Sequence, residues 1–301
     1  MTSLSHLDSL LLSPERLHEA GLTDYKIAQS VREGKLLRLR RGVYIWATNF
    51  HALKPWEKYP LEILAFSKVS PRAIFSHQSA AALYSLGLIG VPDKIHVYSP
   101  ASSRGNSRGV LKHALPLDST SVVTELGLRA TSLTTTVRDC AVVVPFRFGV
   151  AIADSALHLY PLDPEKLRAD LFGYSGRHQT RVRQVAQCMS SLAESPGETL
   201  TRLILDELNL DYAEQVEMRV EGQLYRADFL VKNPQFVVEF DGKTKYLDFQ
   251  PTNQVLLNER SRERKLQRMG YPVFRLEWQD VVYHPEVVKR QLQNFMLGLE
   301  H

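Results

Sequence analysis

Cysteine is scarce in this sequence. The 301 residues include two cysteines, Cys140 and Cys188, which lie far apart and form no CxxC pair. A cysteine-ligated structural zinc site therefore finds no support. Two isolated cysteines fit a reducing compartment, and we expect a cytoplasmic protein.

Long hydrophobic runs are also lacking. The most apolar stretch, CAVVVPFRFGVAIADSAL, is broken by Pro145, Arg147 and Asp154, which excludes an uninterrupted membrane span there. The amino terminus, MTSLSHLDSLLL, has no basic leading region and carries Asp8, so we expect no signal peptide. These absences predict a soluble protein with no membrane partner.

What remains is an ordinary globular composition. Hydrophobic residues make up 44% of the chain and charged residues 23%, which argues against disorder. A length of 301 residues allows two or three domains. The formal net charge of +4 is compatible with nucleic-acid binding but does not require it.

Residues 1–48 have the element order of a winged helix-turn-helix. In SPERLHEAG, Ser13 is placed as the N-cap of a helix, with a proline in its first position and a glycine at its end. TDYKIAQSVREG repeats this pattern, with Thr23 as the N-cap. KLLRLRRGVYIW then alternates apolar and basic residues around a turn at Arg41-Gly42. Two short helices followed by a hairpin are therefore expected.

Cations on this module suggest contact with DNA. The second helix carries Lys26, Gln29 and Arg32 near one side, and the hairpin carries Arg38, Arg40 and Arg41. A basic helix and wing suit phosphate contacts and insertion into a groove. The alternatives are a protein-interaction module or solvated surface arginines.

Residues 49–195 predict an α/β middle domain with a connecting helix. RAIFSHQSAAALYSLGLIG indicates a helix after Ser76, KIHVYSP and GVLKHALPL indicate strands, and TSLTTTVRDCAVV begins another helix. Ser76 and His77 are adjacent, but no GxSxG sequence or third triad member accompanies them. We interpret Ser76 as a helix cap and His77 as structural.

These first two segments resemble the antitoxin family of AbiE-type toxin–antitoxin systems. The matching stretches are LHEAGLTDYKIAQSVREGKLLRLRRGVY, SHQSAAALYSLGL and TSLTTTVRDCA. The resemblance covers about half of the chain. It implies an amino-terminal winged helix that binds DNA, and it does not imply that this chain is an antitoxin.

Residues 196–301, after a joint at Ser-Pro-Gly, predict an α+β domain. GETLTRLILDELNL indicates an amphipathic helix, and DYAEQVEMRVEG, QLYRADFLV and FVVEF indicate three strands. A helix over NQVLLNERSRERKLQRMG, a fourth strand in YPVFRLEW and a closing helix in PEVVKRQLQNFMLGL follow. The whole chain is therefore expected to be a multidomain α+β protein.

Two acids interrupt the apolar strands of this domain. Asp228 lies within YRADFLV, and Glu239 ends the next strand eleven residues later. Buried strands rarely carry carboxylates without a partner, and two neighbouring carboxylates repel each other unless a cation lies between them. Hard oxygen ligands favour Mg²⁺ or Mn²⁺, so the acids predict a metal site.

With a nearby lysine, this constellation resembles the PD-(D/E)xK nuclease superfamily, closest to the subgroup related to the very-short-patch-repair endonuclease. The matching residues are Glu198 on the first helix, Asp228 on the second strand, and Glu239 in EFDGKTKY. The resemblance implies a restriction-endonuclease-like fold and a Mg²⁺-dependent endonuclease that leaves a 5′-phosphate. Asp228 and Glu239 would hold the metal.

The sequence departs from the family pattern at the lysine. Asp241 stands two residues after Glu239, where lysine is expected, and the positive charge comes at Lys243 or Lys245. In an extended strand all four side chains would share one face, but Gly242 can turn the chain. Lys245 is favoured as catalytic and Lys243 as a phosphate contact. Gln215, Glu259 and Arg262 are candidates to support the site, with a solvated ion pair three residues apart on a helix as the alternative for Glu259 and Arg262.

Three functions remain open at this point. The first is a Mg²⁺-dependent DNA endonuclease with a winged-helix module, in defence or repair. The second is a DNA-binding regulator, antitoxin-like, with a degenerate nuclease domain, and the third is a protein–protein adaptor. The expected partner is DNA, and a homodimer is left open.

Overall fold

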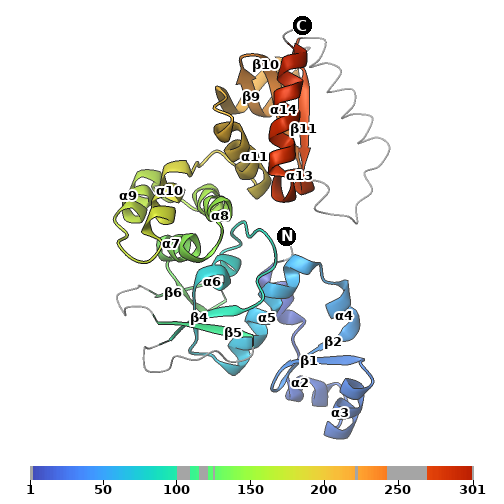
Figure 1. Cartoon of the computed structure of the whole chain (residues 1–301). Helices are drawn as coiled ribbons and strands as arrows, with labels where there is room; N and C mark the ends of the chain where they lie inside the picture. Colours follow the sequence, from blue (N-terminus) through green and yellow to red (C-terminus); the bar gives the residue numbers. More distant parts are fainter. Residues whose placement is uncertain are drawn as a thin grey trace. The chain divides into compact units, whose positions relative to one another are not determined.

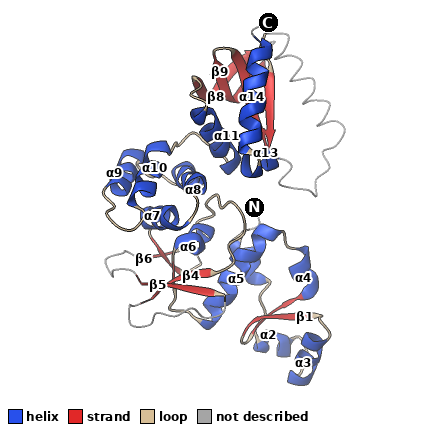
Figure 2. Cartoon of the chain, viewed as in Figure 1, coloured by secondary structure: helices blue, strands red, loops and turns tan. Residues whose placement is uncertain are grey.

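The computed structural model describes residues 3–99, 109–114, 121–124, 126–220, 223–242 and 270–299. The chain is a mixed α+β protein with several sheets (Figures 1 and 2), as the sequence predicts. It divides into two compact units. The N-terminal unit is Met1–Pro145 with Asp170–Val182, and the C-terminal unit is Phe146–Ala169 with Arg183–His301. None of the helices in the described part of the chain has the length and apolarity that a bilayer crossing requires.

The N-terminal unit begins with three short capped helices and a hairpin. Ser13 and Thr23 accept hydrogen bonds from the backbone N–H groups of Arg16 and Lys26, which confirms both predicted N-caps. The turn of the hairpin contains Gly42 at φ 70°, a backbone conformation that favours glycine. The elements are α1 (Leu4–Ser9), α2 (Pro14–Glu19), α3 (Asp24–Arg32), β1 (Leu36–Arg40), β2 (Val43–Trp46), α4 (Ala47–Ala52) and α5 (Pro55–Val69).

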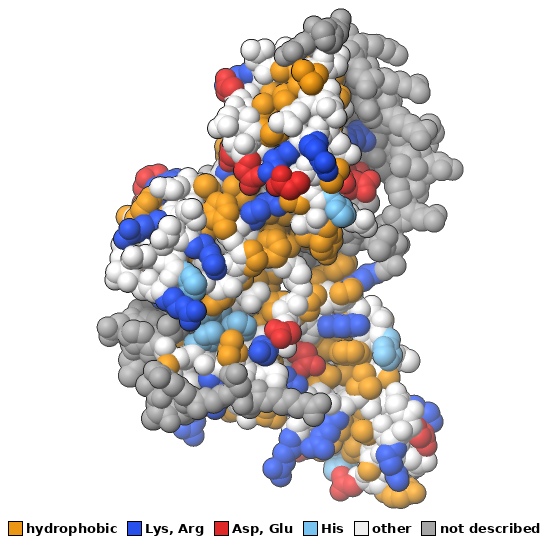
Figure 3. Space-filling view, viewed as in Figure 1, with side chains coloured by type: hydrophobic (Ala, Val, Ile, Leu, Met, Phe, Trp, Pro, Cys, Tyr) orange, Lys and Arg blue, Asp and Glu red, His pale blue; other side chains and the backbone are white. Residues whose placement is uncertain are grey.

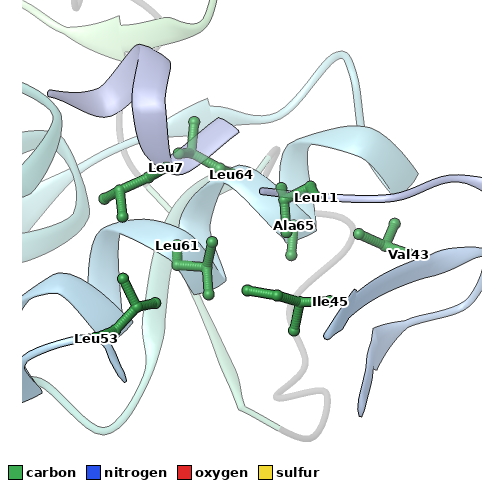
Figure 4. Packing of buried hydrophobic residues seen from close by; sticks show 8 residues of the cluster. All are labelled: Leu7, Leu11, Val43, Ile45, Leu53, Leu61, Leu64 and Ala65. Carbon is green, nitrogen blue, oxygen red and sulfur yellow. The ribbon is translucent and has the colours of Figure 1, made fainter. Parts of the chain in front are cut away.

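An apolar core joins these first elements. Side chains from α1, β2 and α5 pack together, which fixes the hairpin against the long helix α5 (Figure 4). A second cluster, of Leu17, Ile27 and Leu36, packs α2 and α3 against β1. Burial of these aliphatic side chains, each contributing about 1.5–3 kcal/mol, holds the basic helix and hairpin in a fixed arrangement.

The N-terminal unit also contains a five-stranded sheet in the order β5-β4-β3-β7-β6. β3 pairs antiparallel with β4 and parallel with β7, while β4 pairs parallel with β5. Helix α6 packs against both α7 and β4. The elements are β3 (Ile74–Phe75), α6 (His77–Leu83), β4 (Ile95–Ser99), β5 (Val110–Ala114), β6 (Ser121–Val123), β7 (Arg129–Thr131) and α7 (Leu133–Val143).

Ser76 differs from its sequence interpretation. It occupies the N-cap position of α6, but its side chain makes no capping hydrogen bond to the helix backbone. Its hydroxyl instead lies 3.0 Å from Nδ1 of His77. The expected capping bond is therefore wrong, because the hydroxyl is engaged by the neighbouring imidazole.

The C-terminal unit is built on a four-stranded sheet in the order β11-β10-β9-β8. β8, β9 and β10 are antiparallel neighbours, whereas β11 runs parallel to β10. The elements are α8 (Phe146–Leu159), α11 (Pro196–Glu207), β8 (Tyr212–Val220), β9 (Gln223–Lys232), β10 (Gln235–Asp241), β11 (Val273–Glu277), α13 (Trp278–Tyr283) and α14 (Pro285–Leu299). The strands and helices predicted over 196–241 and 271–299 are confirmed, and α13 is an additional helix that was not predicted. The helix predicted over 253–270 lies outside the described residues, except for Gly270. Helices α9 (Pro164–Phe172) and α10 (Gln179–Cys188) cross the division between the units.

A buried ion pair ties α8 to α11 within this unit. Asp154, 1% exposed, accepts hydrogen bonds from Nη2 of Arg202 at 2.7 Å and from the hydroxyl of Thr199 at 2.8 Å. Its other oxygen accepts from the backbone N–H of Ser190 at 2.7 Å. Packing therefore continues across residue 195, where the sequence suggests a joint. The division into 1–48, 49–195 and 196–301 stays a prediction.

Candidate functional site

Asp228 and Glu239 lie on neighbouring strands of the C-terminal sheet. The β9–β10 register pairs Val237 with Leu230 and Val238 with Phe229, and Glu239 and Asp228 are the next residues along these two strands, close enough for the carboxylate of Glu239 to raise the pKa of Asp228. The backbone N–H of Phe240, at the end of β10, donates to Oδ2 of Asp228 on β9 at 2.8 Å and holds that carboxylate in place. The two acids singled out in the sequence are thus brought together.

Close packing brings Glu198 to the same place. The ring of Phe240 contacts Gly197 so closely that a Cβ there would collide with it, and this contact sets the start of α11 against the end of β10. Glu198 is 8% exposed. Its oxygens accept from the hydroxyl of Ser195 at 2.7 Å, the backbone N–H of Glu194 at 2.9 Å and Nε2 of Gln215 at 2.8 Å.

Gln215 is an unusual member of this group. Its φ is 52°, a left-handed conformation that costs a non-glycine residue about 1–3 kcal/mol and is found preferentially at functional sites. Its Nε2 binds Glu198, while its Oε1 is buried and has no hydrogen-bond partner within the described residues. A buried amide oxygen without a donor is a ligand atom available to a cation or a water molecule.

Burial, together with the neighbouring carboxylates, disfavours ionised acids at the site. The pKa of Asp228 is raised from 3.8 to about 6, mainly by burial and further by the carboxylates of Glu198 and Glu239, while the N–H of Phe240 opposes the rise. Burial also raises the pKa of Glu198. A cation placed among these groups would reverse this cost.

Glu239 has two partners that sequence reasoning missed. The hydroxyl of Tyr225 donates to its Oε1, and Nη2 of Arg275 lies 3.4 Å from its Oε2. Arg275 stands directly opposite Glu239 in the parallel β10–β11 ladder. Neither residue has a distinguishing local pattern, because their proximity depends on which strands neighbour β10 and in which direction β11 runs.

The remaining predicted residues are only partly placed. Asp241 is the last residue of β10, opposite Glu277 on β11, and lies two residues beyond Glu239 on its strand. Lys243, Lys245, Glu259 and Arg262 lie outside the described residues, so the catalytic role expected of one of the two lysines stays a prediction.

The basic residues of the N-terminal unit lie on α3 and the β1–β2 hairpin. Lys26, Arg32, Arg38 and Arg41 are exposed, and Figure 3 shows Lys and Arg side chains spread over the drawn face, including the part that carries these elements. Within the described part of the chain, Lys26 and Arg41 form no ion pair.

Two of the residues predicted to contact DNA have protein partners. Arg40 is partly buried, and its Nη1 lies 2.8 Å from Oε2 of Glu62. Gln29 donates to Oε1 of Glu33 at 2.8 Å. A hollow of about 290 Å³ between α3 and the hairpin is lined by Asp24, Ile27, Val31, Arg38 and Tyr44, among others. The exposed cations of α3 and of the hairpin, Lys26, Arg32, Arg38 and Arg41, are therefore more accessible than Arg40.

Comparison with known proteins assigns no family. No family model and no curated protein matches the chain. Among solved structures it is similar to the crystal structure of the RV2827C protein from Mycobacterium tuberculosis, with 17% sequence identity and a TM-score of 0.37 over 66% of this chain and 78% of that one. A similarity at this TM-score supports no inference about fold or function.

Proposed function

We propose that the chain is a Mg²⁺-dependent DNA endonuclease whose C-terminal unit hydrolyses phosphodiester bonds in a PD-(D/E)xK-like site. The observation that carries this proposal is that Asp228 and Glu239 directly follow the last β9–β10 pair, and that the pKa of Asp228 is raised to about 6, first by burial and further by the carboxylates of Glu198 and Glu239. Buried acids kept together against their own repulsion are typical of a site that binds a cation.

The donor atoms at this site fit a hard divalent cation. Asp228 and Glu239 would hold Mg²⁺ or Mn²⁺, with the unpaired Oε1 of Gln215 nearby as a further oxygen ligand. The bound ion would polarise a phosphoryl oxygen and lower the pKa of a coordinated water. Glu198, held by three donors, orients Gln215 through its 2.8 Å hydrogen bond. A lysine at 243 or 245 would then offset the charge that develops on the phosphate.

The N-terminal elements support a DNA-binding role as a winged helix. Two helices, α2 and α3, lead into the β1–β2 hairpin, and apolar packing fixes all four. Exposed cations on α3 and on the hairpin are suited to phosphate contacts. This module would hold the substrate for the C-terminal unit.

A DNA-binding regulator with a degenerate nuclease domain is the second candidate. Tyr225 and Arg275 engage both oxygens of Glu239. A guanidinium at this position already offsets part of the carboxylate charge that a metal would otherwise neutralise. This arrangement favours a site that needs no cation.

The experiment that separates the two candidates measures cleavage and binding together. The full chain is incubated with single- and double-stranded DNA, with Mg²⁺, with Mn²⁺ and with neither. The test variant is Asp228→Ala with Glu239→Ala, and the control removes two exposed acids of the same unit, Asp211→Ala with Glu286→Ala.

We expect metal-dependent cutting by the wild type and the control and at least a 100-fold loss in the test variant. Cutting that persists in the test variant would overturn the assignment of the site. DNA binding by the wild type without cutting under any condition would favour the regulator.

A further inference from the structure

Three histidines from three elements of the N-terminal unit meet in one cluster. His77 begins α6, His96 lies within β4 and His113 lies within β5. One ring nitrogen of each lies within 4.8 Å of those of the other two. Nε2 of His113 is 3.0 Å from Nδ1 of His96, and the rings of His77 and His113 are stacked with 3.7 Å between their centroids.

The fold holds this histidine cluster in place through the sheet. In the parallel β4–β5 ladder, His96 pairs with Leu111 and His113 pairs with Tyr98, so both histidines point to the same face because side chains alternate along strands. The backbone N–H of His96 donates to the hydroxyl of Ser79 on α6 at 2.8 Å. Helix α6 is thereby fixed against β4, with His77 at its first position.

The backbone of His77 is strained. Its φ is 49°, a conformation that costs a residue with a Cβ about 1–3 kcal/mol and persists only where the surroundings enforce it. His77 lies at the turn from β3 into α6, and it is 4% exposed. An uncapped helix start with a strained, buried histidine is not explained by helix stability.

Burial keeps the three imidazoles neutral. It lowers the pKa of His96 to about 4, with further lowering from His113, and it lowers the pKa values of His77 and His113. Neutral imidazole is the form that binds metal ions. Arg138 lies close enough to lower the pKa of His77 further, but its charge is offset by a 3.0 Å ion pair with Asp139.

We propose that His77, His96 and His113 form a Zn²⁺ site, with the fourth position of the ion open to solvent beside the half-buried His113. Three neutral nitrogen donors favour Zn²⁺ or a similar transition metal and disfavour Mg²⁺, which prefers oxygen. Three histidine ligands with an open fourth position match the coordination of reactive zinc sites rather than closed structural ones. This inference is independent of the function proposed for the C-terminal unit.

The distances require one ring to move. Two nitrogens bound tetrahedrally to zinc at 2.0–2.1 Å are about 3.3 Å apart, close to the 3.0 Å between His96 and His113. Because His77 stacks on His113, its ring must rotate to direct a lone pair to the same point. The hydroxyl of Ser76, 3.0 Å from Nδ1 of His77, can accept a hydrogen bond from Nδ1–H, which fixes the tautomer whose Nε2 is free to bind the ion.

The test is a Zn²⁺ titration of the metal-stripped full chain against a chromophoric chelator. We expect one equivalent bound by the wild type and at least a 100-fold weaker affinity in His113→Gln and in His96→Gln. His51→Gln, which removes an exposed histidine of the same unit, should bind as the wild type does. Circular dichroism verifies that each variant is folded, and His113 is the safer substitution because it is less buried.

Two further measurements identify the site. The double variant Asp228→Asn, Glu239→Gln should retain its equivalent of Zn²⁺, and Co²⁺ added to the wild type should give the intense visible absorption of a four-coordinate ion. Equal affinity in the wild type and folded His113→Gln would overturn the proposal. So would loss of the Zn²⁺ equivalent in the carboxylate variant, or the weak Co²⁺ absorption of an octahedral ion.

Discussion

The two units bury titratable groups of opposite kinds. In the N-terminal unit burial lowers the pKa of His96 to about 4, and in the C-terminal unit burial raises the pKa of Asp228 to about 6. Burial favours the neutral form in both cases, but the consequences for metal binding differ. A neutral imidazole is ready to bind a metal, whereas a neutral carboxylic acid must first lose its proton. Burial therefore favours metal binding by the histidine cluster and opposes metal binding by the carboxylate cluster.

The largest expected effect concerns the support of the carboxylate cluster. In Asp154→Ala, Arg202 would stay buried without its 2.7 Å partner, with Asp206 and Glu214 at 3.7 and 3.6 Å as weaker substitutes. Breaking a buried pair in this way costs about 3–5 kcal/mol. Urea denaturation should show this loss, and hydrogen exchange should show faster exchange in α11 than in β4.

The matched control for this prediction is Asp211→Ala, which removes an exposed ion pair with Lys232. We expect a change of at most about 1 kcal/mol. Equal destabilisation by the two variants would show that the buried pair does not support α11.

Sequence patterns reveal the two clusters unequally. Asp228 and Glu239 are conspicuous because each interrupts an apolar strand, and alternation within strands carries that information locally. The histidines stand in three separate elements at positions 77, 96 and 113, and no periodic spacing connects them. The sheet order β5-β4-β3 and the docking of α6 bring them together.

The same distinction explains the other outcomes. Helix starts at Ser13 and Thr23 follow from short-range capping chemistry and could be predicted. The donors to Glu239 could not, because Arg275 reaches it through the parallel pairing of β10 with β11. The left-handed backbone of Gln215 has no local signal either, since the residue is not a glycine or an asparagine.

Acidification should test the histidine cluster. The folded chain keeps His96 neutral down to about pH 4, whereas the unfolded chain protonates it near its ordinary value of 6.5. The contribution of neutral His96 to the free energy of unfolding is therefore fully present above pH 6.5. It is lost as the pH falls toward 4, by at most about 3.4 kcal/mol. In the metal-stripped protein, His96→Gln should reduce this loss, as measured by denaturation at pH 7, 5.5 and 4.5.

Other groups at the cluster also change the size of this effect. His113 and Lys94 lower the pKa of His96, and Asp93 raises it. His77 remains buried in the variant and retains its own pH dependence. The same acid sensitivity in His96→Gln as in the wild type would show that His96 does not contribute.

Asp228 should make folding stability depend on pH in the opposite direction to His96. Its pKa is about 6 in the folded chain and 3.8 ordinarily, so the folded state binds the extra proton and stability falls as the pH rises from 3.8 to 6. Asp228→Asn should therefore be more stable at pH 7, by at most about 3 kcal/mol. The asparagine Oδ1 can still accept from the N–H of Phe240, which preserves the 2.8 Å contact.

Mg²⁺ distinguishes this stabilisation from a general packing effect. At ten times its dissociation constant, Mg²⁺ should stabilise the wild type by about 1.4 kcal/mol and leave Asp228→Asn unchanged in thermal unfolding. Equal stabilisation of both proteins would place the Mg²⁺ elsewhere.

The last prediction compares the exposed cations of the N-terminal unit with those of the C-terminal unit. Arg38 and Arg41 are exposed on the hairpin, and each phosphate contact adds about 0.9 to the salt slope of DNA binding. Arg38→Ala with Arg41→Ala should therefore make the loss of affinity between 50 and 200 mM salt about 12-fold smaller. The control, Lys166→Ala with Arg290→Ala, removes two exposed cations from the C-terminal unit. An equal reduction in both double variants would mean that net charge, rather than the hairpin, determines binding, whereas a reduction confined to the hairpin variant would place the DNA contact on the N-terminal unit.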